Sequence, residues 1–297
     1  MMGAMSDAWF TRRRVLRRLL VALLVPTGAC GGNALLEPGV VPALSPTAAS
    51  ALREHGAGPA AGDVRWRPRP HMTWQWQLTT PVDRSVDAAM FDIDFFDNRR
   101  SVVEDLRRRG RRVVCYLSAG SLEAWRPDAH SFPASVVGRP LNGWPGERWL
   151  DIRRLGVLAP LLERRFDLCR AKGFDGVEAD NVDAYTNATG FPITARDQLR
   201  FNRFLARAAH ARGLSIGLKN DLAQARRLEP SFDWALSEEC FRYAECHLLA
   251  PFVRAGKAVF VVEYQRAPRR FCAKARARGF MAMRKRLRLG AWRRACW

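Results

Sequence analysis

From residue 66 onward, short apolar runs alternate with longer segments in which apolar residues recur at helical spacing. Runs that are rich in branched and aromatic side chains and end at polar or turn-forming residues indicate β-strands. Eight such runs are present, covering residues 74–78, 89–94, 113–117, the apolar part of 173–185, 214–219, 232–237, 258–262 and a weaker 280–283. The pattern therefore predicts eight strands.

Helical segments fill several of the connections between these runs. The spacing predicts helices over residues 98–109, 158–171 and 194–212. A glycine follows each of them, as is usual just past a helix C-terminus. Strands that alternate with helices form parallel sheets, so we predict an α/β fold, a (β/α)8 barrel of the TIM type, for residues 66–297. A doubly wound open sheet is the alternative, although no G-x-G-x-x-G motif supports dinucleotide binding.

The first 30 residues have the pattern of a signal peptide. Three arginines, Arg12 to Arg14, precede an apolar stretch over residues 19–25, which is far shorter than the roughly 20 residues of a membrane span. Paired arginines followed by Val-Leu resemble the twin-arginine motif. Cys30 closes a Thr-Gly-Ala-Cys sequence similar to a lipoprotein processing site. Two outcomes stay open, namely lipidation of Cys30, which would tether the protein to a membrane, and plain cleavage nearby.

Residues 31–65 are rich in Ala, Pro and Gly and show little periodicity. This composition predicts a flexible linker between the export signal and the barrel. We expect an exported protein that is extracellular, periplasmic or anchored to a membrane.

The net charge of +20 is unevenly distributed. Residues 1–30 carry five arginines and one acidic residue, and residues 254–297 carry fourteen basic residues and one acidic residue. The part between them has 30 basic and 27 acidic residues and is nearly neutral. A basic C-terminal segment can bind polyanions, but such a run is more often a solvated face, so we expect no nucleic-acid partner.

The seven cysteines contain no C-x-x-C pair, which argues against a zinc ribbon or finger. Disulfides are expected if the chain is exported. Cys240 with Cys246 and Cys272 with Cys296 are plausible pairs. The sequence does not fix the pairing among Cys169, Cys240, Cys246, Cys272 and Cys296.

One acidic stretch stands out, GFDGVEADNVDAY at residues 173–185. It holds four carboxylates within nine residues: Asp175, Glu178, Asp180 and Asp183. The sequence predicts a buried strand that runs into an acidic loop. In barrel enzymes, the catalytic groups lie at the C-terminal ends of the strands. A solvated acidic turn is the alternative.

Polar side chains follow most of the predicted strands, and in a barrel they would converge on one pocket. They are Gln77, Asp94, Ser118, Asp180, Lys219 with Asn220, Glu238 and Glu263. A pair of carboxylates bordered by aromatic rings is the apparatus of glycoside hydrolysis, in which one carboxylate attacks the sugar or positions water and the other protonates the leaving oxygen. The aromatic candidates are Trp74, Trp76, Trp125, Tyr185 and Tyr264.

Taken as a set, these motifs resemble the endo-α-1,4-polygalactosaminidases of glycoside hydrolase family 114. The matching motifs are Trp74-x-Trp76-Gln77-Leu78, Phe91-Asp92-Ile93-Asp94, Tyr116-Leu117-Ser118-Ala119-Gly120-Ser121, Trp125-Arg126-Pro127, the acidic stretch, Gly217-Leu218-Lys219-Asn220, Ser237-Glu238-Glu239-Cys240-Phe241 and Val262-Glu263-Tyr264. The resemblance implies a secreted retaining enzyme that cuts galactosamine-containing exopolysaccharides of biofilms.

The resemblance also implies roles for individual residues. Asp180 aligns with the family nucleophile and Glu238 with the acid/base, although Glu239 stands directly beside Glu238. Side chains of successive strand residues point to opposite sides, so only one of these glutamates can face the pocket. The expected substrate-binding residues are Trp74, Asp92, Asp94, Tyr116, Asp183, Tyr185, Lys219, Asn220, Glu263 and Tyr264.

The sequence calls for no cofactor and no metal, and we expect a monomer. A carboxylate-bound metal at Asp92, Asp94 and Asp180 is a weak alternative, since no histidine joins the cluster. A non-catalytic glycan-binding barrel is the main competing function, followed by a polyanion-binding protein that uses the basic C-terminal segment.

Overall fold

The computed structural model describes residues 65–297. The predicted export signal and nearly all of the predicted linker lie outside these residues. Eight parallel strands form one sheet: β1 (Trp74–Gln77), β2 (Met90–Asp94), β3 (Arg112–Ser118), β7 (Gly176–Asp180), β8 (Ser215–Lys219), β9 (Trp234–Glu238), β10 (Val259–Glu263) and β11 (Met281–Lys285). The eight predicted runs each correspond to one of these strands, and the predicted barrel is confirmed.

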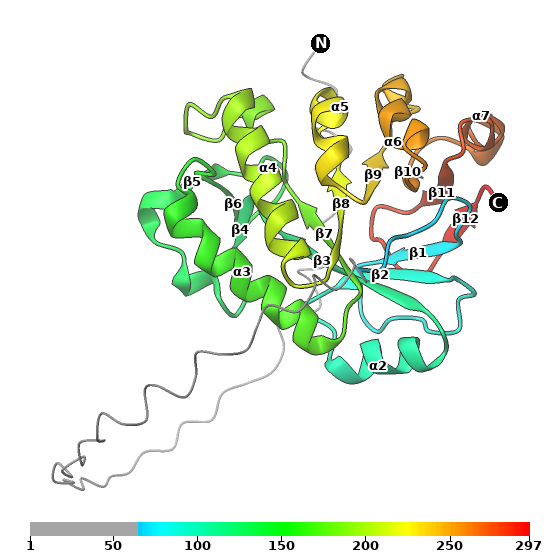
Figure 1. Cartoon of the computed structure of the whole chain (residues 1–297), viewed down its shortest axis with the longest axis horizontal. Helices are drawn as coiled ribbons and strands as arrows, with labels where there is room; N and C mark the ends of the chain where they lie inside the picture. The colour runs from blue at the N-terminus through cyan, green and yellow to red at the C-terminus, as the bar shows by residue number, and fades with distance from the viewer. Residues whose placement is uncertain (1–64) are drawn as a thin grey trace, which may run out of the picture.

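Helices lie outside the sheet, with α3 and α4 packed side by side (Figure 1). They are α2 (Arg100–Arg108), α3 (Leu155–Lys172), α4 (Ala195–His210), α5 (Ala225–Leu228), α6 (Ala250–Arg254) and α7 (Cys272–Ala277). Single 3-10 turns occupy the loops: η3 (Ala129–Ser131), η4 (Ala134–Val136), η5 (Ala184–Thr186), η6 (Leu222–Gln224), η7 (Glu229–Ser231), η8 (Cys246–Leu249) and η9 (Pro268–Arg270).

The helix ends follow their sequence signals. Thr194 caps α4 in a reciprocal capping box with Asp197, which satisfies backbone N–H groups that the first turn leaves unpaired. Gly173 follows α3 with φ of 90°, a left-handed conformation that glycine adopts without steric cost.

A ninth strand, β12 (Arg293–Ala295), pairs antiparallel with β11. The segment before it bridges toward β1, where the Leu78 N–H donates to the Leu289 carbonyl at 2.9 Å. The Arg293 guanidinium also donates to the Trp74 carbonyl. The C-terminal segment therefore covers the seam between the first and last parallel strands.

A second, small sheet follows β3 and contains β4 (Ser121–Glu123), β5 (Val137–Pro140) and β6 (Glu147–Leu150), in the order β4-β6-β5. It lies on the left in Figure 1. The sequence indicated only a long connection here, because these strands have three or four residues each.

Alternation along each strand divides the core in two. Inward-pointing residues fill the barrel, among them Trp74, Trp76, Trp234, Phe260 and Met283, whereas the intervening residues pack beneath the helices. Gly217 makes room for Trp234, since a Cβ at Gly217 would lie 2.4 Å from the indole ring. Bulky side chains thus fill one end of the barrel and leave polar groups at the C-terminal ends of the strands.

Three disulfides hold the fold together, joining Cys115 to Cys169, Cys240 to Cys246 and Cys272 to Cys296. The second and third confirm the plausible pairs. The first joins β3 to α3 and was not predicted, because its cysteines are 54 residues apart and nothing in the sequence brings them together. None of the helices within residues 65–297 is long and apolar enough to cross a membrane.

Candidate active site

The period-two alternation of β7 sends Glu178 and Asp180 to the inside of the barrel, whereas Val177 and Ala179 join the outer core. On β8 the same alternation brings Lys219 inward. These three side chains are all buried. The charged groups of two adjacent strands therefore meet inside the barrel, at the end where each strand stops.

Lys219 is the centre of this group. Its Nζ lies 2.7 Å from Glu178, 3.2 Å from Asp180 and 3.4 Å from Glu238 of β9, with only 1% of the side chain exposed. It also lies 4.7 Å from the centroid of the Trp76 ring. A buried cation surrounded by three carboxylates and an aromatic face offsets charge that the barrel interior could not otherwise hold.

Two donors besides Lys219 fix the orientation of Asp180. Oδ2 accepts a hydrogen bond from the Tyr116 hydroxyl at 2.9 Å, and Oδ1 accepts one from the Asn181 N–H at 2.9 Å in addition to the contact with Lys219. Asn181 adopts φ of 61°, an uncommon conformation for a residue other than glycine. Both oxygens of Asp180 are thus oriented by groups from three strands.

Asn181 in turn is held by a buried hydrogen-bond network. Its amide donates to Ser118 at 2.8 Å, to Ser121 at 3.0 Å and to Glu147 of the small sheet at 3.0 Å. Gly120 permits the close approach, because a Cβ there would lie 1.7 Å from the Asn181 carbonyl oxygen. The small sheet therefore supports the backbone turn that directs an N–H at Asp180.

Glu238 is fixed in the same way from both sides. The Tyr264 hydroxyl donates to Oε1. Asn220 donates to Oε2 at 3.3 Å through its amide and accepts the backbone N–H of Glu238 at 2.9 Å. Because Asp180 Oδ1 and Glu238 Oε2 both contact one nitrogen, the sum of the two distances limits their separation to about 6.6 Å.

Glu239 faces the other way. Its carboxylate accepts two hydrogen bonds of 3.1 Å from Arg242, and its backbone has φ of 57°. Glu263 lies on that same outer side, where it accepts the backbone N–H of Phe241 at 2.9 Å. Burial raises the pKa of Glu263 to about 7, and the charge of Glu239 adds to this effect. Of the two adjacent glutamates, Glu238 is therefore the one that shares Lys219 with Asp180.

Asp92 and Glu178 form a second carboxyl pair, deeper in the barrel. Burial, together with the charge of Glu178, raises the pKa of Asp92 well above its ordinary value. Neither Asp92 oxygen accepts a hydrogen bond from an N–H or O–H donor among the described residues, which fits a protonated Asp92 that donates to Glu178. This pair supports Lys219 from the side of the barrel core.

Asp183 and Asp221 follow β7 and β8 and extend the group of carboxyl side chains beyond Asp180. Burial and the charge of Asp180 raise the pKa of Asp183 to about 6. Burial and the charge of Asp183 raise the pKa of Asp221 to about 8, although Tyr185 and Asn202 donate to its two oxygens at 3.2 and 2.9 Å. The edge of the site beyond Asp180 is therefore acidic.

Not every expected substrate-binding residue reaches this site. Trp74 is fully buried in the barrel core, where its Nε1 donates to the Met281 carbonyl at 2.9 Å, so the expectation of a sugar-stacking surface needs correction. Asp94 shares the inner face of β2 with Asp92, and its carboxylate is engaged by an ion pair of 2.6 Å with Arg126 and by backbone N–H groups just before α2. Glu263 points to the outside, and Asp92 is enclosed. Of the others, Tyr116, Asp183, Lys219, Asn220 and Tyr264 do lie around Asp180 and Glu238, and Tyr185 contacts Asp221.

Several residues of the site were not assigned a role from the sequence. Glu178 could have been found, because it lies two residues before Asp180 and strand alternation places both on one face. No sequence signal indicates that Glu147 supports Asn181, since Glu147 belongs to the small sheet, which the sequence did not predict. Within residues 65–297, no His, Cys, Asp and Glu side chains form a group of three or more that could hold a metal ion.

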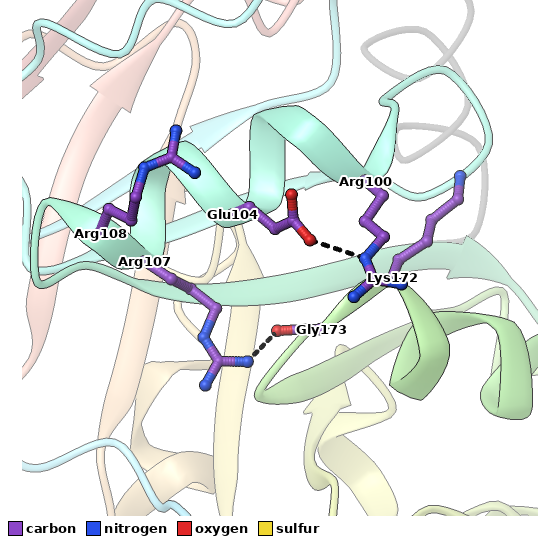
Figure 2. Close-up of a pocket in the computed structure, with 6 residues that line it drawn as sticks. All are labelled: Arg100, Glu104, Arg107, Arg108, Lys172 and Gly173. Carbon is purple, nitrogen blue, oxygen red and sulfur yellow. Dashed lines mark hydrogen bonds and ion pairs between the residues drawn. The ribbon is translucent and has the colours of Figure 1, made fainter.

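A surface hollow of about 470 Å³ between α2 and the end of α3 is a different feature (Figure 2). Its charged side chains are occupied with the protein itself. Arg100 pairs with Glu104 at 2.7 Å, and Arg107 donates to the Gly173 carbonyl at 2.6 Å. Lys172 donates to two backbone carbonyls. The hollow lies in the outer helical layer and has none of the carboxylates described above.

Two oriented carboxylates at the C-terminal end of a (β/α)8 barrel define the class of barrel glycoside hydrolases. The family comparison agrees, because the model of glycoside hydrolase family GH114 matches residues 56–297. The chain belongs to this family.

Two solved structures share the fold. The structure of Ega3 from Aspergillus fumigatus in complex with galactosamine has a TM-score of 0.74 and 40% sequence identity, over 78% of this chain and 97% of that one. The glycoside hydrolase domain of PelA from Pseudomonas aeruginosa has a TM-score of 0.57 and 16% identity, over 73% of this chain and 94% of that one.

An uncharacterized protein of Deinococcus radiodurans is 30% identical over 189 residues. The match covers 54% of this chain and 58% of that protein, so the chain spans less than two thirds of this relative.

Proposed function

We propose that the protein is an endo-acting hydrolase of α-1,4-linked galactosamine and N-acetylgalactosamine polymers, with Asp180 as nucleophile and Glu238 as acid/base. The observation that carries the proposal is the shared contact of both carboxylates with Lys219. It limits the separation of their facing oxygens to about 6.6 Å. Retaining glycosidases need roughly 5–5.5 Å between the two carboxyl groups, and inverting enzymes need about 6.5–9.5 Å. The limit favours retention of configuration.

The choice of substrate rests on charge and on similarity. Ega3, which shares 40% of its aligned residues with this chain, was solved with galactosamine bound. Galactosamine carries an ammonium group at neutral pH. Asp180 and Asp183 supply negative charge around the site, and a carboxylate–ammonium pair in a partly buried position is a strong interaction. An acidic site in a basic protein is suited to a polycationic chain.

The reaction divides into two displacements. A carboxylate oxygen of Asp180 forms a bond to the anomeric carbon while the bond to the leaving oxygen breaks and Glu238 transfers its proton to that oxygen. Glu238 then accepts a proton from water, the water oxygen bonds to the anomeric carbon, and the bond to Asp180 breaks. Tyr116 and the Asn181 N–H hold the Asp180 oxygens in place, and Tyr264 and Asn220 orient Glu238.

The experiment is a digestion of partly acetylated α-1,4-galactosaminan, with product masses followed over time and the anomeric configuration of the first products read by NMR. We expect a fast drop in polymer length and initial products of the α configuration. Asp180→Asn should bind the polymer without cutting it. Initial β products would show that the two carboxylates act by inversion, and unchanged turnover by Asp180→Asn would remove the nucleophile assignment.

We also propose that the protein is exported and acts as a monomer. Three disulfides within residues 65–297 fit an oxidising compartment. The Arg-rich start and the Thr-Gly-Ala-Cys sequence support export, with Cys30 either lipidated or lost by cleavage. Expression of the full chain with a Cys30→Ser variant beside it decides between these two. Lipidation predicts membrane partitioning that the variant loses.

A further inference from the structure

A second hollow adjoins the carboxylates at the mouth of the barrel. It has a volume of about 380 Å³ and is lined by Tyr264, Gln265, Arg284, Lys285, Arg286, Leu287 and Trp292. Small-molecule pockets span roughly 300–1,000 Å³, so it can hold a sugar residue. Its residues come from the end of β10, the end of β11 and the loop toward β12.

Tyr264 connects this hollow to the reaction centre. Its hydroxyl donates to Glu238, and the same residue lines the hollow. Around the barrel, Asp180 ends β7, Glu238 ends β9, and Lys285 ends β11. A path from Asp180 past Glu238 therefore leads to the hollow. In a retaining glycosidase the acid protonates the leaving oxygen, so the hollow lies on the side of the leaving group.

The charge of the hollow is opposite to that of the carboxylate site. Arg284 and Arg286 contribute two cations, and the ammonium of Lys285 is buried behind them, where it donates to the Gly290 carbonyl at 2.6 Å. No Asp or Glu is among the described residues that line the hollow. Arg286 stacks over Trp292 at 4.8 Å from the ring centroid, which presents a guanidinium beside an aromatic surface. Arg284 donates to the Tyr264 carbonyl at 3.1 Å, which places its charge next to the link with Glu238.

We propose that this hollow is the binding subsite for the leaving-group sugar and that it selects N-acetylgalactosamine over galactosamine. The inference rests on the proposed function and specifies where in the polymer the enzyme cuts. An ammonium group would meet the like charges of Arg284 and Arg286 there, which is unfavourable at short range. An acetamido group is neutral, its carbonyl oxygen accepts from arginine, and its methyl group packs against Trp292 or Leu287.

The two sides of the barrel mouth then bind differently charged sugars. Asp183, which is ionised above pH 6, follows β7 on the side of Asp180. The cations lie at the C-terminal end of β11, on the side of Glu238. Cleavage is therefore directed to bonds that have galactosamine on the Asp180 side and N-acetylgalactosamine on the leaving side.

The test is a brief digestion of a randomly, half-acetylated α-1,4-galactosaminan in H₂¹⁸O, which labels each new reducing end. Tandem mass spectrometry then reads the residue at each new non-reducing end. We expect acetylated residues there in about tenfold excess over free amines, since a like-charge contact at this range is worth on the order of tenfold in selectivity. Equal proportions, or an excess of free amines, would overturn the proposal.

Charge variants make the test specific. Arg286→Glu should abolish or reverse the preference, and Arg286→Gln should weaken it. Arg288→Glu is the matched control, because Arg288 is exposed, lies two residues away and does not line the hollow. Equal preferences in the Arg286→Glu and Arg288→Glu enzymes would also overturn the proposal. Failure of the folded wild-type enzyme to cut any galactosaminan would reject the proposed function itself, whereas cutting with random ends rejects only the subsite.

Discussion

Lys219 and Glu238 lie on neighbouring strands with 3.4 Å between Nζ and Oε2. The same ammonium contacts Asp180, so one buried cation lies between the two carboxyl groups and offsets the repulsion between them. The residue at position 219 thus sets the spacing of the proposed catalytic pair.

Replacement of this cation should affect both folding and turnover. Lys219→Met keeps the length of the side chain but leaves Glu178, Asp180 and Glu238 without their shared partner. We expect a loss of about 3–5 kcal/mol in the free energy of unfolding, because uncompensated charges stay buried, together with loss of activity. The deficit should shrink as the pH falls, since protonation neutralises the orphaned carboxylates. Denaturant titrations at several pH values measure it.

Lys257→Met is the control for the loss of a lysine at a strand start, because Lys257 pairs with Glu229 in a partly exposed position. Its effect should be within about 1 kcal/mol. Similar losses in the two variants would show that the position of Lys219 among the carboxylates has no special energetic importance.

The two adjacent glutamates can be separated by matched amide substitutions. Glu238→Gln cannot donate or accept the catalytic proton, and we expect turnover to fall by about 10²- to 10⁴-fold with little change in polymer binding. Glu239→Gln keeps a hydrogen-bonding group toward Arg242 on the outer side and should retain most of the activity. Initial rates on the same polymer give the comparison. An active Glu238→Gln enzyme beside an inactive Glu239→Gln enzyme would reverse the assignment.

Asp183 should make substrate binding depend on pH. Its pKa of about 6 means that it is ionised above pH 6 and neutral below. KM for cationic oligomers should therefore rise as the pH falls through 6 in the wild-type enzyme, and Asp183→Asn should lack this step. Asp87→Asn, which removes an almost fully exposed carboxylate on another loop, serves as control. The same step in the Asp183→Asn enzyme would exclude Asp183 as its cause.

Asp221 should make the free energy of unfolding fall as the pH rises, which is the opposite direction from carboxylates whose pKa is lowered by folding. Its folded-state pKa of about 8 lies above the ordinary value of 3.8, so the folded protein holds a proton that the unfolded chain releases. This contribution to stability is complete at low pH and is lost as the pH rises from about 4 to 8, by at most about 1.4 kcal/mol per pH unit. Asp221→Asn should lack this loss and gain on the wild type as the pH rises. If the difference in the free energy of unfolding between the wild type and Asp221→Asn is the same at pH 5 and pH 8, the assignment is contradicted.

The Cys115–Cys169 bridge should be a major source of stability. It closes a loop of 54 residues between β3 and α3, for which chain entropy predicts about 4 kcal/mol. The double variant Cys115→Ala/Cys169→Ala should unfold at lower denaturant concentration by that amount. The Cys240–Cys246 bridge, with a separation of only six residues, should contribute less, and a larger loss on its removal would contradict the loop-length argument.

Strand alternation made much of the fold and part of the site predictable. Each inner strand is a near-continuous apolar run that ends in a polar residue, which is why the eight parallel strands and the positions of Asp180, Lys219 and Glu238 could be anticipated. The same alternation indicates which of the two glutamates points inward. Trp234 and Leu236 fill the barrel, and Glu238 continues their alternation whereas Glu239 does not.

The parts of the fold and of the site that were not predicted depend on contacts between residues far apart in the sequence, which local patterns do not indicate. β12 reads as a charged tail because it contains Arg293 and Arg294, and its strand character comes only from pairing with β11. Glu263 ends a strand as the catalytic candidates do, yet it continues the outward alternation of Val259 and Val261, and its carboxylate accepts the Phe241 N–H. The Trp74 side chain is of a type that stacks on sugar rings, but it lies fully buried in the barrel core. Burial, rather than residue type, separates these cases.

The C-terminal seam has a consequence for the order of assembly. Synthesis delivers β1 more than two hundred residues before Leu289 and Arg293, which satisfy the backbone groups of Leu78 and Trp74. Until that segment arrives, β1 keeps an unpaired edge, the kind of surface that recruits other strands. The hollow beside Tyr264 also has no wall before then, because Arg286 and Trp292 belong to the same segment. Closure of the barrel and completion of the proposed subsite therefore depend on the same C-terminal segment.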